Sequence, residues 1–246
     1  MTNELVTALI TGAGSAIGRA VAKALAGKHF QVHALDVHED RLHSLANEID
    51  CVCHAIDITD TQSLEALMEN MEVDVLVNNA GVLPAVTTLD ALTRDQLDSL
   101  IDVNLRAPCH LTRLVLPGML ARNRGHIFMT GSSSAFTPNP NIAVYAATKA
   151  AIHMLCKDIR FDLIGKNIRV TEIAPGRVQS RLYEDVFGEQ EANKRLYDNF
   201  DAIQPEDLAR LVITALDMPS HCDVTLFEVF PTMQQTGGTR TVVKDG

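Results

Sequence analysis

Seven short apolar runs restrict the fold of this chain more than any other feature, because they are almost continuously hydrophobic and do not alternate with polar residues. Continuous runs of this kind are typical of strands in a parallel sheet that is covered on both faces. We therefore expect strands at residues 5–10, 31–35, 52–56, 73–77, 126–130, 169–173 and 225–230.

The segments between these runs carry apolar residues at spacings of three and four, which predicts amphipathic helices. These segments cover residues 16–26, 41–48, 61–71, 94–122, 143–163 and 205–217. Ser15, Asp60 and Thr93 stand where helix caps are expected. Alternating strands and helices require right-handed crossovers. We predict one α/β domain over residues 1–246, a doubly wound Rossmann-type fold with a seven-stranded, mostly parallel sheet and helices on both faces.

The charge balance disfavours several classes of partner. The chain has 31 acidic residues against 21 Lys and Arg, a formal net charge of −10 and no Trp, whereas nucleic acids and anionic membranes require clustered cations. No apolar stretch is long enough to span a bilayer, and the first residues lack the positive region of a signal peptide. The five cysteines are odd in number and scattered, which favours the reducing cytoplasm.

A metal site is the alternative use of nine histidines and five cysteines. Cys51 and Cys53 would share one face of a strand, but the chain has no second cysteine pair at zinc spacing and no His-Glu-x-x-His motif. We interpret the two cysteines as small buried apolar residues and predict no metal site.

A glycine-containing segment follows the first expected strand and leads into the first helix: Thr11-Gly12-Ala13-Gly14-Ser15-Ala16-Ile17-Gly18. Glycines allow the backbone to turn tightly and to approach a pyrophosphate, and the helix N-terminus supplies N–H donors. A glycine trio alone is weak evidence, but its position between strand and helix predicts a dinucleotide site.

Asp36 closes the second strand at the position expected for a carboxylate that binds the adenosine ribose hydroxyls. Because a carboxylate repels a 2′-phosphate, we predict NAD in preference to NADP; His38 and Arg41 lie close enough to oppose that preference. The alternative role of Asp36 is a helix cap. The next two strands end in Asp57-Ile58 and in Asn79-Ala80-Gly81, which we expect against the adenine and ribose, although ordinary turns use the same residue types.

Tyr145 and Lys149 are four residues apart in the helix expected at 143–163, so both project from one helix face. An ammonium beside a phenol favours the phenolate and lowers the phenol pKa. Ser132, at the end of the fifth strand, would bring a second hydroxyl to the same edge of the sheet, and two hydroxyls aimed at one oxygen polarise a carbonyl or accept an alcohol proton. Ser133 and Ser134 compete for this role.

The chain resembles the short-chain dehydrogenases/reductases over nearly its whole length. The resemblance rests on the glycine segment, Asp57, Asn78-Asn79-Ala80-Gly81, Asn104, Ser132, Tyr145-Ala146-Ala147-Thr148-Lys149 and Pro175-Gly176. It implies that Tyr145 is the acid/base, that Lys149 binds the nicotinamide ribose and lowers the tyrosine pKa, that Ser132 holds the substrate oxygen, and that Asn104 anchors a proton-relay water. An alternative for Asn104 is a polar residue at a helix kink.

The resemblance also implies that Pro175, Gly176 and Val178 shape the nicotinamide pocket, with Ser180 beside the carboxamide. The sequence departs from the family pattern at Ala16, where the family has its middle glycine, and in lacking a glycine pair after the last strand. Residues 230–235, together with 203–207 and 169–176, resemble the branch that contains serine and 3-hydroxy acid dehydrogenases and sulfoacetaldehyde reductases.

The polar segment 177–202 follows a strand end, and we interpret it as a substrate lid over the carboxyl edge of the sheet; a surface helix is the alternative. Arg177 and Arg181 at its start would bind a carboxylate or sulfonate, or else be solvated. We predict an NAD(P)-dependent oxidoreductase of small alcohols or carbonyl compounds, including anionic ones, with a non-catalytic dinucleotide sensor as the alternative. We also expect a homodimer or homotetramer through the helices at 94–122 and 143–163, and a mobile tail at 236–246.

Overall fold

A computed structural model describes residues 6–198 and 200–235 of the chain, and its strands form a seven-stranded sheet. The strands are β1 (Thr7–Thr11), β2 (Gln31–Asp36), β3 (Cys51–Ala55), β4 (Val75–Asn78), β5 (Gly125–Thr130), β6 (Ile168–Pro175) and β7 (Leu226–Val229). Their spatial order is β3-β2-β1-β4-β5-β6-β7 and each neighbouring pair is parallel. The predicted doubly wound fold is confirmed, and the sheet is parallel throughout.

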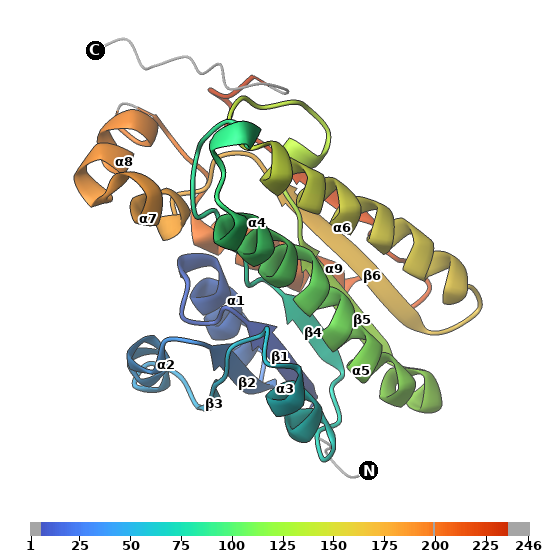
Figure 1. Cartoon of the computed structure of the whole chain (residues 1–246). Coiled ribbons are helices and arrows are strands. Elements are labelled where there is room, and N and C mark those ends of the chain that lie inside the picture. Colours follow the sequence, from blue (N-terminus) through green and yellow to red (C-terminus); the bar gives the residue numbers. More distant parts are fainter. Residues whose placement is uncertain (1–5, 199, 236–246) are drawn as a thin grey trace.

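Two helical layers cover the sheet (Figure 1). One layer holds α1 (Ala16–Ala26), α2 (Glu39–Ala46) and α9 (Pro205–Asp217), and the other holds α3 (Thr61–Met68), α4 (Arg94–Ile101), α5 (Ala107–Arg122) and α6 (Ala143–Asp162). Each layer buries its own apolar cluster against one sheet face. Strands β1, β4, β5 and β6 are buried almost throughout and can be hydrophobic without alternation, whereas the edge strands β3 and β7 are only partly buried.

The three expected helix caps are confirmed. The side chains of Ser15, Asp60 and Thr93 accept hydrogen bonds from the backbone N–H groups of Gly18, Ser63 and Gln96 respectively. The long helix predicted at 94–122 is instead α4 and α5 joined by a π-helical turn at Asp102–Arg106. The other helix and strand ends differ from the predicted ones by a few residues, and residue 5 lies outside the described part of the chain.

The chain reverses its direction of sheet growth between β1 and β4, which are neighbours in space. Doubly wound folds bind ligands at such a switch point, beyond the carboxyl ends of the strands. Here the loops after both strands are joined by the Asn79 amide, whose Nδ2 donates to the carbonyl oxygens of Thr11 at 3.1 Å and Gly12 at 3.2 Å. The Asn79 side chain therefore holds the loops after β1 and β4 together at the switch point.

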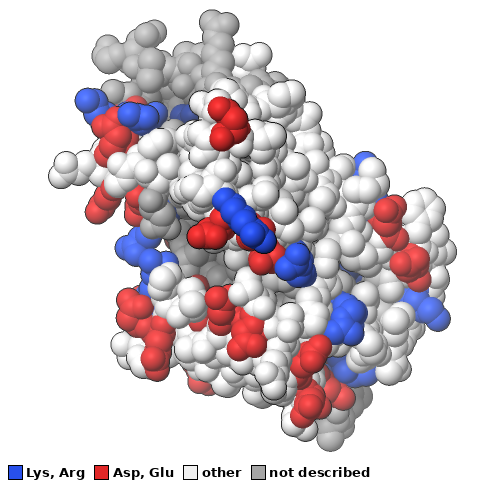
Figure 2. All heavy atoms as spheres, in the orientation of Figure 1, with Lys and Arg blue, Asp and Glu red and all other residues white. Residues whose placement is uncertain are grey.

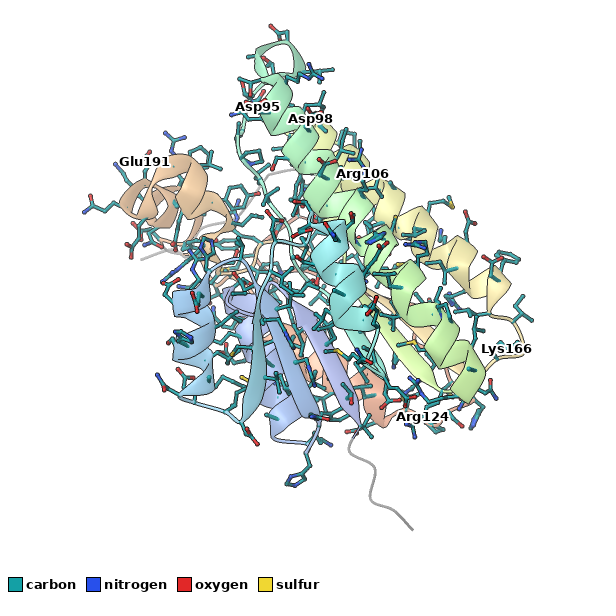
Figure 3. The ribbon with its side chains drawn as sticks, turned by 60° about the horizontal axis from the view of Figure 1, so that its bottom comes forward. Asp95, Asp98, Arg106, Arg124, Lys166 and Glu191 are labelled. Carbon is teal, nitrogen blue, oxygen red and sulfur yellow. The ribbon has the colours of Figure 1, made fainter. Side chains whose placement is uncertain are left out.

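The polar segment 177–202 leaves the sheet after β6 and contains a short 3₁₀ turn followed by α7 (Glu184–Phe187) and α8 (Glu189–Leu196). Figure 3 shows Glu191, on α8, at the opposite end of the molecule from Arg124 and Lys166, which precede β5 and β6. The segment thus stands at the carboxyl edge of the sheet. The tail that we predicted at 236–246 lies outside the described residues.

Acidic and basic side chains are mixed over the face shown in Figure 2, without a continuous basic patch among the residues described there. Within the described ranges, the model contains no helix with the length and hydropathy needed to cross a membrane.

Candidate functional site

A cavity of about 830 Å³ opens at the carboxyl ends of the strands, between the switch point and the 177–202 segment. Most of the site residues predicted from the sequence line it: Gly12, Ser15, Ala16, Ile17, Asp36, Asp57, Ile58, Asn79, Ala80, Gly81, Ser132, Tyr145, Lys149, Pro175, Gly176, Arg177, Val178, Ser180 and Arg181. Two predicted residues, Gly18 and Asn104, are not in its wall. The structure therefore brings together side chains from loops that follow β1 through β6.

The glycine segment forms a tight turn from β1 into α1. Gly12 has a φ of +63°, a conformation that favours glycine. Ser15 locks the turn, because its hydroxyl donates to the Gly12 carbonyl at 2.7 Å and accepts from the Gly18 N–H at 3.2 Å. A Cβ on Gly18 would overlap the Gly12 carbonyl oxygen. Gly18 is therefore needed for close packing beneath the loop, and α1 begins at Ala16 with its N-terminus at the cavity.

Asp36 is almost completely buried and has both carboxylate oxygens in hydrogen bonds. One oxygen accepts from the Gly14 N–H and the other from the His38 N–H, each at 2.9 Å. The alternative role as a helix cap is wrong, because the residue at the N-cap position of α2 is His38. Asp36 instead ties the glycine loop to the end of β2, and His38 and Arg41 line the cavity beside it.

Asp57 makes the local turn that we considered as its alternative role. Its Oδ1 accepts from both the N–H and the hydroxyl of Thr59, each at 2.8 Å. Asp57 and Ile58 also line the cavity, so the turn presents them to it. The structure thus permits the predicted contact with a nucleotide base and explains the residue type without one.

Tyr145 and Lys149 lie close together on α6, exposed by only 8% and 4%. The Lys149 Nζ stands 5.7 Å from the centre of the Tyr145 ring and donates to the Thr130 carbonyl at 2.8 Å. The Ser132 hydroxyl forms a hydrogen bond with Tyr145 and also accepts from the Ser134 N–H. Of the three neighbouring serines, Ser132 is thus the one hydrogen-bonded to the phenol.

Burial governs the protonation of this group. It raises the pKa of the Tyr145 phenol above its ordinary value, and the hydrogen bond from Ser132 only partly opposes the increase. Burial also lowers the pKa of Lys149 to about 8, against the electrostatic effect of Glu172. Burial therefore outweighs the hydrogen bond from Ser132, and the expected lowering of the phenol pKa by Lys149 stays a prediction.

Asn104 lies in the π-helical turn and is 1% exposed. Its side chain accepts from the Val82 N–H at 2.8 Å and donates to the Val82 carbonyl at 2.9 Å. A Cβ on Gly81 would stand 3.2 Å from the Asn104 Oδ1 and 3.7 Å from the Lys149 Nζ. Asn104 therefore lies behind the loop that follows β4, at the kind of helix distortion that often marks functional sites.

The two arginines of the 177–202 segment differ in their surroundings. Arg177 is half-buried, with its guanidinium 4.7 Å above the Phe200 ring and a hydrogen bond to the Leu196 carbonyl at 3.2 Å. The Arg181 side chain is 68% exposed and lies 3.6 Å from the Glu184 carboxylate. Both line the cavity. Arg181 could turn toward a ligand, whereas Arg177 is held in place.

Several cavity residues were not anticipated, above all Tyr183, Phe187 and Arg195 in the same segment and Gln234 after β7. Tyr183 packs against Tyr145 in a small apolar cluster. A signal was present, because two of the three tyrosines of the chain fall in this otherwise polar stretch. Gln234, whose Oε1 accepts from the Arg177 N–H at 2.8 Å, carried no recognisable signal.

Metal ligands are not gathered in the described part of the chain, where no group of three or more His, Cys, Asp or Glu side chains is arranged to hold a metal ion. The Cys51 and Cys53 sulfurs lie 3.9 Å apart on β3 and are partly buried.

Comparison with known proteins gives one consistent result. The family model described as short chain dehydrogenase matches residues 6–191. An uncharacterized short-chain type dehydrogenase/reductase of Sinorhizobium fredii is 46% identical over 97% of this chain and 96% of its own length. An NADP-dependent 3-hydroxy acid dehydrogenase of Salmonella typhi is 31% identical over 94% of this chain and 96% of its own. The closed form of a serine dehydrogenase complexed with NADP⁺ superposes with a TM-score of 0.91 at 28% identity, covering 97% of this chain and all of that one.

Proposed function

This chain belongs to the short-chain dehydrogenase family, and on that premise we propose that it transfers a hydride between a nicotinamide dinucleotide and a small alcohol or carbonyl compound. The observation that carries the proposal is the placement of Tyr145, Lys149 and Ser132 in the same cavity as the glycine turn. Such a reaction transfers one proton and one hydride, and the two transfers must be aligned with each other. The cavity brings together residues suited to the proton transfer and residues suited to binding the hydride carrier.

The residues present fit a dinucleotide. Gly12 and the N-terminus of α1 line the cavity, and Asp36 lines it beside them. When bound, the nicotinamide ring supplies or accepts the hydride. The residues that would hold the dinucleotide are Gly12, Ser15, Ala16, Ile17 and Gly18 at the pyrophosphate, Asp36, Asp57, Ile58, Asn79, Ala80 and Gly81 toward the adenosine and ribose, and Pro175, Gly176, Val178 and Ser180 toward the nicotinamide.

Tyr145 acts as the acid/base in this proposal. Its hydroxyl donates a proton to a carbonyl oxygen during reduction and removes one from an alcohol during oxidation. Ser132 binds the same substrate oxygen through a second hydrogen bond. Lys149 binds the nicotinamide ribose and presents a positive charge to the phenol. Asn104 fixes the loop after β4 through Val82, and we keep its role of anchoring a proton-relay water as a prediction.

We propose that the 177–202 segment is the substrate lid and that the substrate is a small hydroxy acid or a similar anion. The two ends of the segment are joined by the Val178–Ile203 bridge, and the segment carries Arg177 and Arg181 to the cavity. The similarity to a 3-hydroxy acid dehydrogenase and a serine dehydrogenase supports this substrate class. The direct test is a panel of hydroxy acids, hydroxy-sulfonates, polyols and neutral alcohols, followed by NADH or NADPH absorbance.

Replacing both lid arginines should weaken binding of an anionic substrate selectively. In the Arg177→Gln/Arg181→Gln variant, KM for the best hydroxy acid is expected to rise about tenfold or more, because charge-assisted hydrogen bonds to the carboxylate are lost. KM for the methyl ester of the same acid should stay within about twofold. Arg210→Gln, an exposed change on α9, is the control. Equal effects on acid and ester would reject the anion-binding role.

We propose NAD as the preferred cofactor because the Asp36 carboxylate is held by two N–H groups at the place where a 2′-phosphate would come. Asp36→Asn keeps the shape but removes the charge, so the ratio of kcat/KM for NADP to that for NAD should rise about tenfold. Asp40→Asn, exposed nearby on α2, should leave the ratio unchanged. The 3-hydroxy acid dehydrogenase named above is NADP-dependent and the serine dehydrogenase structure contains NADP⁺. Wild-type preference for NADP would overturn this proposal.

A non-catalytic dinucleotide sensor of the same fold is the alternative. It would bind the cofactor but turn over nothing in the panel. A sensor has no requirement for a buried tyrosine beside a buried lysine, and the burial of both is costly. For that reason we favour the enzyme.

We further propose that the protein forms a homodimer or homotetramer through its long helices, in a reducing compartment such as the cytoplasm. Met154 and Phe161 on α6 are exposed by 53% and 73%, and large apolar side chains of this kind are often covered by a second subunit. All five cysteines are free thiols, which supports the compartment. Light scattering of the purified protein gives the number of subunits.

A further inference from the structure

A second buried ionic group, outside the cavity wall, lies close to Lys149. Glu172 sits in the middle of β6 and is 1% exposed. Its Oε2 is 2.6 Å from the His153 Nδ1, and its Oε1 has no hydrogen-bond partner in the described structure. A buried carboxylate costs much free energy unless nearby cations compensate for the lost water. Burial raises the pKa of this carboxyl, and the nearby His153, Lys149 and Lys157 oppose the increase and favour its ionised form.

The partner helix is the one that carries the proposed catalytic pair. Tyr145, Lys149 and His153 follow one another at intervals of four on α6, so they share one helix face. The same face that presents the phenol and the ammonium to the cavity thus continues to the imidazole that contacts Glu172. The His153 ring is in turn packed edge-on against Phe136, with ring centres 4.6 Å apart.

The end of β5 provides space for the carboxylate. A Cβ on Gly131 would overlap the Glu172 Oε1. Gly131 is flanked by Thr130 and Ser132, and the Thr130 carbonyl accepts a hydrogen bond from the Lys149 ammonium. The Glu172 carboxylate therefore rests against the same short piece of backbone that positions the lysine and the serine of the site.

The charged surroundings of Glu172 come from α6. Lys149, His153 and Lys157 act on it as favourable charges, and the Cys156 thiol also lies within electrostatic range. On the neighbouring strands, the residues in register with Glu172 are the apolar Met129 of β5 and Leu226 of β7. The carboxylate thus faces α6, where it contacts His153 and lies within electrostatic range of the proposed catalytic lysine.

We propose that Glu172 is a positioning residue for the reaction proposed above: oriented by His153, its buried carboxylate keeps the Lys149 amine protonated and fixed on the Thr130 carbonyl. Burial lowers the pKa of Lys149 to about 8, and this value already includes the opposing effect of Glu172. Without this carboxylate the amine would lose its proton at a lower pH, and the site would lose the positive charge that serves the ribose and the phenol.

The test is a titration of Lys149 in the whole protein. The amine pKa is measured by NMR on protein labelled at lysine Cε, with the signal assigned through Lys149→Arg. In Glu172→Gln, which keeps the side-chain size, we expect the Lys149 pKa to fall by about one unit. The falling limb of the kcat/KM profile should move to lower pH by the same amount. Glu172→Asp, which keeps the charge, should recover most of the shift.

Glu228→Gln is the matched control, since Glu228 is exposed on the adjacent strand β7, and it should titrate as wild type. Where Glu172→Gln does not fold, the reciprocal measurement decides: Lys149→Met should raise the pKa of the Glu172 carboxyl, because coupling between two sites is mutual. An unchanged Lys149 pKa in folded Glu172→Gln, or an unchanged Glu172 pKa in Lys149→Met, overturns the proposal. Absence of turnover in the wild type would instead refute the proposed function, and the pKa values of Lys149 and Glu172 could still be measured.

Discussion

Tyr145→Phe should lower kcat by about a thousandfold while cofactor affinity stays within a few-fold of wild type, because a positioned acid/base contributes about 10² to 10⁴ to the rate. Phenylalanine keeps the ring that covers the Lys149 ammonium and loses only the hydroxyl that Ser132 contacts. The fold should therefore survive. Stopped-flow or steady-state absorbance of the reduced nicotinamide gives the rate, and calorimetry gives the dissociation constant.

Tyr197→Phe is the matched control for the loss of a phenol. The Tyr197 hydroxyl donates to the Val178 carbonyl at 2.9 Å and accepts from the Ser180 N–H at 3.3 Å, so it holds lid backbone and does not face the cavity. We expect kcat to fall by less than about tenfold, which corresponds to the loss of one or two hydrogen bonds. Should Tyr145→Phe retain a tenth of wild-type kcat, another group must move the proton.

Gly18→Ala should both destabilise the fold and weaken the binding of the cofactor. The added methyl would overlap the Gly12 carbonyl and approach the Asn79 amide within 2.8 Å. Both neighbours are fixed, since Asn79 donates to Thr11, Gly12 and Ser15. Forcing an extra methyl into such packing costs about 1–3 kcal/mol, which is roughly 3–10 °C in Tm for a chain of this size. Differential scanning calorimetry measures it.

The cofactor effect should exceed the stability effect, because relief of the overlap must push the glycine turn out toward the cavity. A dissociation constant about tenfold or more above wild type is expected. Gly27→Ala is the control on the same helix: its φ is −63° and the nearest atoms to a new Cβ are 3.5 Å away. That variant should be neutral or slightly stabilised. Equal Tm values for the two variants would show that the packing beneath the loop is not tight.

The fold was largely predictable because its strands are buried on both faces. Residues 126–130, for example, show no alternation of polar and apolar side chains, and β5 lies close to this position. The glycine turn was equally accessible, since Ser15 and Gly18 act through neighbours a few residues away. Local patterns of this kind depend little on the rest of the molecule.

Long-range features were not accessible. The interruption at Asp102–Arg106 arises where Asn104 reaches Val82 across the fold, and helical periodicity alone carries no sign of it. The pairing of Glu172 with His153 joins a strand to a helix. The burial that raises the pKa of Tyr145 was not accessible either, because the sequence shows the neighbouring Lys149 but not how far the phenol is removed from solvent.

The two ends of the 177–202 segment meet side by side, where Gln179 donates to the Ile203 carbonyl at 2.9 Å and Ile203 donates to the Arg177 carbonyl at 3.1 Å. Between these anchors, Tyr183 packs on the apolar cluster that contains Tyr145, so the segment also contacts the body at the cavity. The residues of the proposed lid after Ser180 can be exchanged to change substrate preference, while Tyr145 and Lys149 keep their places on α6. A new substrate preference can thus be sought by varying one contiguous stretch of sequence, while the sheet and its helices stay unchanged.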